Sequence, residues 1–372
     1  MKLSLLCFIT LFLSSVHAAD IGLSARALGM GNAYTAVVNN GDAIFYNPAG
    51  LAKLGAFNWT ILDPALGVNN VDSFQDYLDI AEDSSDVNQI INELYGEEVT
   101  VYTGAKSLMN FGGFAFGVYG VVDSNFLVNN PVYPNIETSY RVDYGLVAGW
   151  GFELVPKLFN FGVQARRVAR QGGSFPIGVS TIATLDSETI QNELNRSGIG
   201  YAFDVGATLT FPGALKPTLA FSWRDVGDTS FEPTDGSVAP TSVRQEQIVG
   251  LGLNYESLFM DIRPAIDFRF LNDSDTQLGK KINLGVEISW PIIDIRGGFH
   301  QGYYSAGASF DLWLMRIDAA TYGVELGEYP GQLEDRRYML QVSFEFGIDP
   351  GSFSFFKLSR PSVRNHNRKV RR

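Results

Sequence analysis

The sequence is poor in the residues with which most enzymes do chemistry. It contains one cysteine, Cys7, and three histidines, His17, His300 and His366. No histidine or cysteine cluster has the spacing of a zinc site, and no Gly-x-Ser-x-Gly nucleophile elbow is present. Because Cys7 lies in a segment that we expect to be removed, the mature chain should have neither disulfides nor thiolate chemistry. We predict no cofactor and no metal.

Charge is also scarce. Charged residues make up 18% of the chain, and its formal net charge is −12. This acidic balance disfavours nucleic-acid binding, which requires a basic face. The exception is a basic C-terminal tail over residues 348–372, which we interpret as solvated and periplasmic. Contact with an anionic partner or lipid headgroups is the alternative. Its basic residues include Arg360, Arg364, Arg368, Lys369, Arg371 and Arg372.

Long hydrophobic runs are confined to the N-terminus. Lys2, the apolar stretch from Leu3 to Val16 and the small-residue site Val16-His17-Ala18 predict a cleaved secretory signal over residues 1–18. Beyond it, no apolar stretch approaches the roughly 18 residues of a membrane helix. We therefore expect an exported protein without helical spans.

What the sequence contains in abundance is glycine, aromatic residues and long alternating segments. It has 39 Gly, 27 Phe and 16 Tyr. Apolar residues alternate with polar residues or glycine, as over residues 282–290. Such segments exceed the ~5–6 residues of globular strands and match the ~9–11 of tilted membrane strands. This pattern predicts an all-β fold, a transmembrane antiparallel β-barrel of about 14 strands. A soluble β-sandwich is the alternative.

The strand pattern also predicts the barrel's two ends. We expect strands near 54–62, 98–106, 110–121, 138–152, 158–169, 200–211, 216–225, 245–256, 259–270, 280–290, 292–299, 303–310, 312–322 and 336–347. The connections alternate between long and short, with a short one at 107–109 and an exception at 300–302. Barrels of this kind have short periplasmic turns and long external loops, so both termini should be periplasmic. Residues 73–95 and 184–195, in two long loops, have helix-like apolar spacing.

Charged residues fall on the inward face of these strands. The period of two directs into the lumen Arg141, Asp143, Asp204, Arg224, Asp261, Arg263, Asp267, Arg269, Glu287, Asp294, Arg296, Arg316, Asp318 and Glu345. Mixed signs favour cross-strand pairing and contacts with whatever fills the lumen. A path for an ion or a polar solute is the alternative, in which arginine would bind a ligand carboxylate.

The segment before the first strand differs from the strands. Residues 20–53 are small and punctuated by Gly29 and Gly31, and they lead into Asn47-Pro48-Ala49-Gly50. Pro48 forbids a central strand, and Asn47 can cap a short helix that Pro48 begins. A compact segment of this kind is suited to plugging a wide barrel. We predict a hatch over 20–53 inside a barrel over 54–347.

These motifs resemble those of a known family. Ala25-Arg26-Ala27-Leu28-Gly29-Met30-Gly31-Asn32-Ala33 and Asp42-Ala43-Ile44-Phe45-Tyr46-Asn47-Pro48-Ala49-Gly50-Leu51-Ala52 resemble the N-terminal signature of FadL-like outer-membrane transport proteins, most of all the PorV-like branch. Residues 296–299 and 326–338 resemble the family more loosely. In this family the first segment is a hatch in a fourteen-stranded barrel, and the Asn-Pro-Ala turn belongs to it. Where many barrels end on an aromatic residue, this chain continues beyond Phe346.

Three functions follow as expectations. FadL-like members carry long-chain fatty acids or other hydrophobic molecules and release them sideways into the membrane. PorV-like members assist protein export, so envelope proteins would be the partners. The third and least favoured alternative is an outer-membrane enzyme, for which His300, beside Gln301 and Gly302 in a tight loop, is the candidate. In every case outer-membrane lipids surround the protein.

Overall fold

The structure is a computed structural model. It describes residues 22–69, 98–129, 135–178, 196–234, 236–257, 259–312 and 314–348. The predicted signal, the two helix-like loop segments 73–95 and 184–195 and the basic tail beyond Ile348 lie outside these residues.

Strands dominate the fold, as the alternation of apolar residues requires. They are β1 Phe57–Val68, β2 Glu98–Phe111, β3 Phe114–Asn129, β4 Asn135–Val155, β5 Phe159–Gly178, β6 Ser197–Thr210, β7 Thr218–Arg224, β8 Phe231–Pro233, β9 Glu246–Gly252, β10 Tyr255–Glu256, β11 Asp261–Phe268, β12 Ile282–Ser289, β13 Ile293–His300, β14 Tyr303–Leu312, β15 Met315–Glu325 and β16 Glu334–Ile348.

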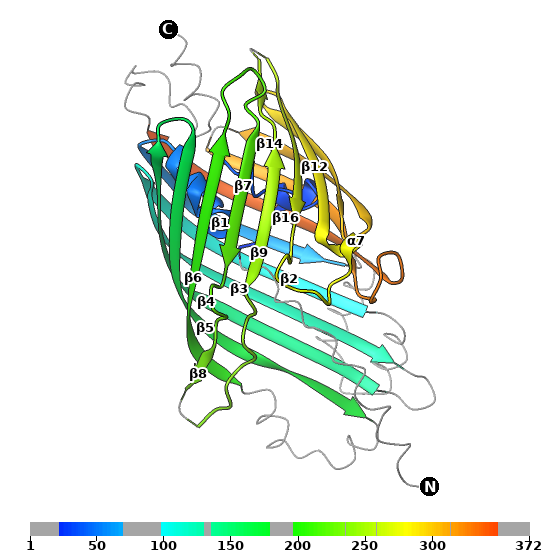
Figure 1. The fold of residues 1–372 in the computed structure, drawn as a ribbon. Coiled ribbons are helices and arrows are strands. Elements are labelled where there is room, and N and C mark those ends of the chain that lie inside the picture. The colour runs from blue at the N-terminus through cyan, green and yellow to red at the C-terminus, as the bar shows by residue number, and fades with distance from the viewer. Residues whose placement is uncertain are drawn as a thin grey trace.

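The sheet closes on itself. Strands pair antiparallel in sequence order around the ring, with β7 next to β9, β9 next to β11, and β16 next to β1. The short β8 pairs only with β6, and β10 extends β9 along β11. Without these two short pieces, the ring contains fourteen strands (Figure 1). The predicted fourteen-stranded antiparallel β-barrel is thus confirmed.

Several predicted strand boundaries are wrong. β3 continues to Asn129 and β5 to Gly178, past the expected ends at 121 and 169. Two further errors have a local cause. We expected a turn at 107–109, but β2 runs unbroken to Phe111 and the turn lies at Gly112-Gly113. Both glycines have positive φ, which glycine adopts without strain. The first strand also continues past the expected end at 62. It accommodates Pro64 by a register shift between Thr60 and Asp63, a β-bulge that leaves Ile61 and Leu62 both facing outward.

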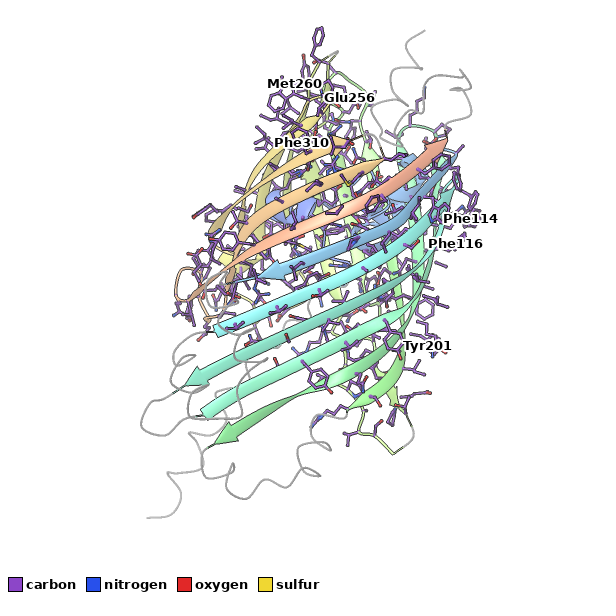
Figure 2. All side chains as sticks on the ribbon, turned by 180° about the vertical axis from the view of Figure 1, so that it is seen from behind. Phe114, Phe116, Tyr201, Glu256, Met260 and Phe310 are labelled. Carbon is purple, nitrogen blue, oxygen red and sulfur yellow. The ribbon has the colours of Figure 1, made fainter. Side chains whose placement is uncertain are left out.

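The outer face of the barrel is apolar around the ring. Outward side chains such as Leu146, Phe203, Ile295 and Leu340 are each about half exposed. Aromatic rings collect at the end with short turns, where Phe114 stacks on Trp150 at 5.0 Å (Figure 2). Water would meet this surface at a large free-energy cost, whereas hydrocarbon would not. No helix in the described residues is long and apolar enough to cross a membrane.

The N-terminal segment lies inside the ring. Helices α1 Ala25–Gly29 and α2 Ala43–Tyr46 and the 3-10 helix η1 Pro48–Lys53 run across the lumen near the short-turn end (Figure 1, blue). Nearly all of their side chains are buried. We call residues 22–53 the hatch. A fourth helix, α7 Leu278–Lys281, lies in the loop before β12.

Candidate functional site: the hatch and the wall around it

The hatch approaches the wall most closely where the wall has glycine. A Cβ at Gly162 of β5 would lie 2.2 Å from the carbonyl carbon of Pro48, and one at Gly206 of β6 would lie 2.0 Å from Asn47 Oδ1. Real Cβ contacts are never so short, so only glycine allows η1 to rest on these strands. The sequence motif around Pro48 thus meets a matching glycine surface on the wall.

A second glycine surface holds the other end of the hatch. A Cβ at Gly285 of β12 would lie 2.0 Å from the Met30 carbonyl oxygen, and one at Gly298 of β13 would lie 2.4 Å from the Gly31 nitrogen. Gly31 itself has φ +62°, a conformation that L side chains rarely adopt. The predicted hatch glycines therefore lie against wall glycines. We name these two glycine surfaces the glycine cradle.

Local capping explains the shape of the motif. Asn47 is extended, and its side-chain oxygen accepts a hydrogen bond from the Ala49 nitrogen at 3.1 Å. Pro48 takes the first position of η1, where its missing N–H costs nothing. A Cβ at Gly50 would press on Ala43 and Val38 at 3.0 Å. Each residue of the predicted Asn47-Pro48-Ala49-Gly50 motif thus shapes the turn or its packing.

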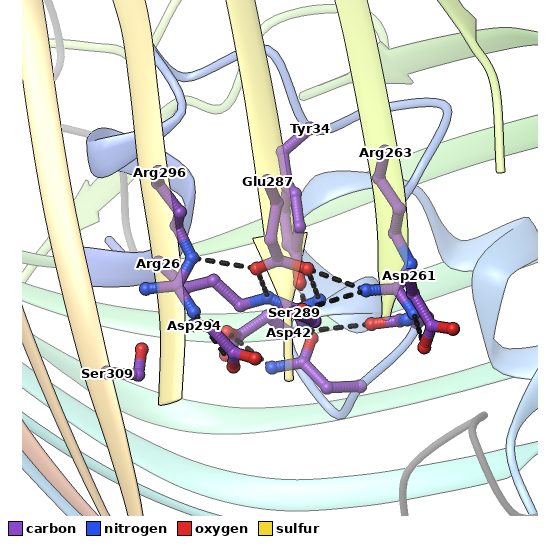
Figure 3. Close-up of polar contacts among 12 residues, drawn as sticks. Arg26, Tyr34, Asp42, Asp261, Arg263, Glu287, Ser289, Asp294, Arg296 and Ser309 are labelled. Carbon is purple, nitrogen blue, oxygen red and sulfur yellow. Dashed lines mark hydrogen bonds and ion pairs between the residues drawn. The ribbon is translucent and has the colours of Figure 1, made fainter. Parts of the chain in front are cut away.

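One carboxylate ties the hatch to β11–β13. Glu287 is fully buried and lies among three guanidinium groups (Figure 3). Arg26 of the hatch donates to it at 2.6 and 2.7 Å, Arg263 at 2.8 Å and Arg296 at 2.7 Å. Charge-assisted bonds of this kind are the strong ones, and removing one partner would leave buried charge unpaired. The network continues to Asp261, Asp294 and Asp318.

Asp267 of β11 provides a further polar contact with the hatch. Its carboxylate accepts hydrogen bonds from the backbone nitrogens of Tyr34 and Thr35, both at 2.9 Å. Beside it, Gly250 of β9 gives the hatch room at Thr35. This part of the hatch is held mainly through its backbone nitrogens, which the sequence pattern does not reveal.

The other predicted lumen residues pair along the wall. Arg141 contacts Asp123 and Asp143, and Asp204 pairs with Arg166 at 2.7 Å. Arg224 and Arg269 share Glu246. All are inward, with buried or half-buried side chains. The prediction omitted Arg166, Arg170 and Glu246, although the period of two places them inward as well.

A third polar group joins the hatch to β16, β1 and β2. Lys106 of β2 pairs with Asp42 of the hatch and, at 3.4 Å, with Asp63 of β1. Gln341 of β16 donates to both oxygens of Asp63 at 2.8 and 2.9 Å, and it accepts a hydrogen bond from the Ala25 nitrogen at 2.8 Å. We call Asp42, Lys106, Asp63 and Gln341 the latch; the sequence analysis missed it.

Burial and charge act in opposite directions on Asp42. Burial alone would raise the pKa of its carboxyl. The neighbouring ammonium of Lys106 and hydrogen bonds to the carboxylate, including one from Asn40, instead lower the pKa below the ordinary aspartate value. Asp42 is therefore ionised at neutral pH. The hatch carries a fixed negative charge at its contact with β2.

Directly outside the latch the wall is hollowed. A groove of about 580 Å³ lies across β16 and β1–β4, and its outward lining includes Pro64, Thr103, Ala105, Gly120 and Val342. Ala105 pairs with both Pro64 and Gly120 in the sheet, so small side chains form the floor. Leu66, Tyr144 and Leu340, each about half exposed, form its borders. Pro64 has no N–H to donate, so the ladder of β1 is weakened there.

His300 is not the exposed loop residue that the sequence suggested. It ends β13, is buried, and its Nδ1 lies 3.1 Å from Asn283 Oδ1. Its ring meets that of Tyr322 edge-on at 6.2 Å. The ring therefore belongs to the packed inner wall.

The class of protein defined by these features is a closed fourteen-stranded antiparallel barrel with a buried N-terminal segment in its lumen. No family model and no curated protein matches the sequence. Among solved structures, the monoaromatic hydrocarbon channel CymD has a TM-score of 0.51 at 10% identity, covering 89% of this chain and 99% of its own. This likeness shows a shared fold.

Two more distant structures also align. The toluene transporter TodX of P. putida has a TM-score of 0.48 at 12% identity, covering 89% of this chain and 99% of its own. A FadL homologue of Pseudomonas aeruginosa has a TM-score of 0.33 at 10% identity, covering 88% of this chain and 98% of its own. The barrel fold expected from the sequence is shared with CymD, whereas membership of the FadL-like family and of its PorV-like branch stays a prediction.

Proposed function

We propose that this protein is an outer-membrane channel for the passive passage of hydrophobic small molecules, which leave the barrel sideways through the wall at the groove. Monoaromatic hydrocarbons and long-chain fatty acids are the substrate classes that we expect. The proposal rests above all on one juxtaposition. The hatch occupies the short-turn half of the lumen, and the wall next to it has an apolar outer groove with a β-bulge beside it.

The hatch argues against a water-filled route along the barrel axis. It is buried, it meets strands around the ring, and on the glycine cradle its backbone touches the wall backbone. A polar solute would need a hydrated path past these contacts. A hydrophobic solute needs only a path into hydrocarbon, because its transfer from water to lipid is favourable.

The groove supplies the features of such a path. Its volume of about 580 Å³ is in the range of small-molecule sites. The bulge at Ile61 and the absent N–H of Pro64 weaken the β1–β2 ladder at this place. If β1 and β2 separated briefly here, backbone N–H and C=O groups would be exposed. The polar side chains of the latch, on the inner face of the same strands, could form hydrogen bonds with them.

The fold comparison is consistent with this function. CymD, whose fold this chain shares, is described as a monoaromatic hydrocarbon channel. That description concerns CymD, and at 10% identity it gives no residue-level equivalence. It suggests which probes to test first.

The tight hatch also favours a second candidate, a PorV-like scaffold for envelope proteins. A scaffold needs no passage, and backbone contact between hatch and wall suits a permanent plug. The two candidates differ in one measurable property: only the channel speeds the entry of hydrophobic molecules.

The channel proposal is tested by measuring uptake in a variant whose groove is filled by a larger side chain. Gly120 faces outward, and a Cβ there meets only Tyr144 at 3.9 Å, so Gly120→Leu fills the groove without strain. Uptake of toluene and of oleate is compared in cells that carry the native chain, Gly120→Leu or no copy. We expect the native chain to raise uptake and Gly120→Leu to remove most of the gain.

A matched control separates the groove from the rest of the wall. Gly297 of β13 also faces outward, and a Cβ there has nothing within 4 Å. Gly297→Leu should leave uptake unchanged. Equal uptake with and without the native chain would refute the channel, and co-purification with envelope proteins in that case would favour the scaffold.

A further inference from the structure

The latch lies on the inner surface of the same strands that carry the groove. Asp63 precedes Pro64, Lys106 follows Ala105, and Gln341 is flanked by Leu340 and Val342. Since successive residues of a strand face opposite sides, each latch residue of the wall is next to an outward residue that lines the groove. Inner latch and outer groove are two faces of one patch of wall.

The latch forms a closed circuit through the hatch. From Asp42 it runs to Lys106, then to Asp63 and Gln341, and it returns to the hatch at the Ala25 nitrogen. Three neighbouring strands and two hatch helices are thereby joined. All four side chains belong to residues less than one-tenth exposed.

The charges within the circuit do not balance. One ammonium serves two carboxylates, Asp42 on the hatch and Asp63 on the wall. If Asp42 leaves, Lys106 keeps a partner in Asp63. If Lys106 follows the hatch, Asp63 is left as a buried charge beside the bulge, which is costly. The free energy of moving the hatch and the stability of the wall at β1 are therefore linked through the side chain of Lys106.

We propose that Lys106 is a positioning residue that couples the hatch to the wall at the groove, so that displacement of the hatch loosens β1 at its bulge. This inference deepens the proposed channel function and rests on it. The pairing of Lys106 therefore determines whether the wall is closed or open to hydrophobic solutes.

Cysteine labelling tests the coupling without any transport. The only cysteine of the chain is Cys7, in the expected signal, so Ala43→Cys places a single thiol in the mature hatch at a fully buried position. A water-soluble maleimide reacts when the hatch moves. We expect Asp42→Asn to speed labelling roughly tenfold, equivalent to about 1.4 kcal/mol of lost attachment. Asp63→Asn should slow labelling below the native rate, because release of Asp42 would then leave Lys106 without a partner.

Asp225→Asn is the matched control. Asp225 is also a buried carboxylate bound to an arginine, Arg166, at 2.5 Å, but both belong to the wall side of the lumen. Its neutralisation should leave labelling at the native rate. The same native rate in Asp42→Asn would overturn the latch. Faster labelling in Asp42→Asn together with the native rate in Asp63→Asn would overturn the coupling to β1.

Uptake distinguishes failure of the inference from failure of the function. If labelling follows the expected pattern while the native chain never raises toluene or oleate uptake, the latch stands and the channel fails. If uptake depends on Gly120 but labelling ignores both aspartates, the channel stands and the role of Lys106 is refuted.

Discussion

The hatch meets the wall in two different ways on two sides of the barrel. On β5, β6, β12 and β13 it rests on the glycine cradle, where backbone touches backbone, and beside the cradle Arg26 is held by the fully buried Glu287 of β12. On β16, β1 and β2 it is joined by the latch, through side chains that carry charge. Close packing can only be lost by distortion, whereas an ion pair can be exchanged for another partner or a proton. The comparison identifies the cradle as the fixed support and the latch as the part that can release.

The largest effect is expected from a side chain placed in the cradle. Gly162→Val would drive a Cβ into the Pro48 backbone, which cannot retreat through the lumen. Overpacking of this severity exceeds the usual cost of about 1–3 kcal/mol and should prevent the barrel from closing over the hatch. Urea unfolding in detergent micelles measures it. Gly297→Val, in open space, is the control and should unfold like the native chain.

A smaller but still large loss is expected at Glu287. Glu287→Gln removes the negative charge that three arginines share, and leaves them with an amide. Breaking a buried pair by removing one partner costs roughly 3–5 kcal/mol. The same unfolding assay applies, with Glu328→Gln in an exposed loop as the control. Native stability in Glu287→Gln would show that Asp261, Asp294 and Asp318, and not Glu287, balance these arginines.

The smallest effect is expected from acid at the latch. Since the folded-state pKa of Asp42 is lowered, its contribution is complete above the unfolded value of about 3.9 and is lost as pH falls through the folded value. A spin label at Lys53→Cys should therefore be more mobile in Asp42→Asn than in the native background at neutral pH. The two should converge only below about pH 4. Convergence near pH 6 would contradict the strong pairing with Lys106.

The barrel could be predicted because its pattern is local. Alternation over residues 282–290 or 336–347 depends only on neighbours in the chain, and it gave the correct strand count. Two of the boundaries that failed involve Pro64, which a bulge retains within β1, and the turn at Gly112-Gly113, which the polar residues near 107 masked. Two others, the ends of β3 and β5, failed because these strands continue into segments that read as loops.

The site was harder to predict because its contacts are distant in sequence. The period of two placed Arg263, Glu287 and Arg296 inward, but nothing local linked them to Arg26 of the hatch. Lys106 was missed for the same reason, since its partners are 43 and 64 residues away in the chain. The usable signal was Lys106 itself, the one charged residue among the inward positions from Thr100 to Asn110 of β2. The glycine count was visible, yet which glycines meet the hatch depends on closure of the ring.

One measurement tests most directly the claim that solutes leave through the wall at the groove. Pro64 and Ala105 are outward register partners on β1 and β2, at a separation that a disulfide can bridge. Pro64→Cys with Ala105→Cys should abolish hydrophobe uptake when oxidised and restore it when reduced. The same pair at Val286 and Gly297, on β12 and β13, should have no effect. Full uptake through a barrel whose β1 and β2 are covalently joined would contradict the account.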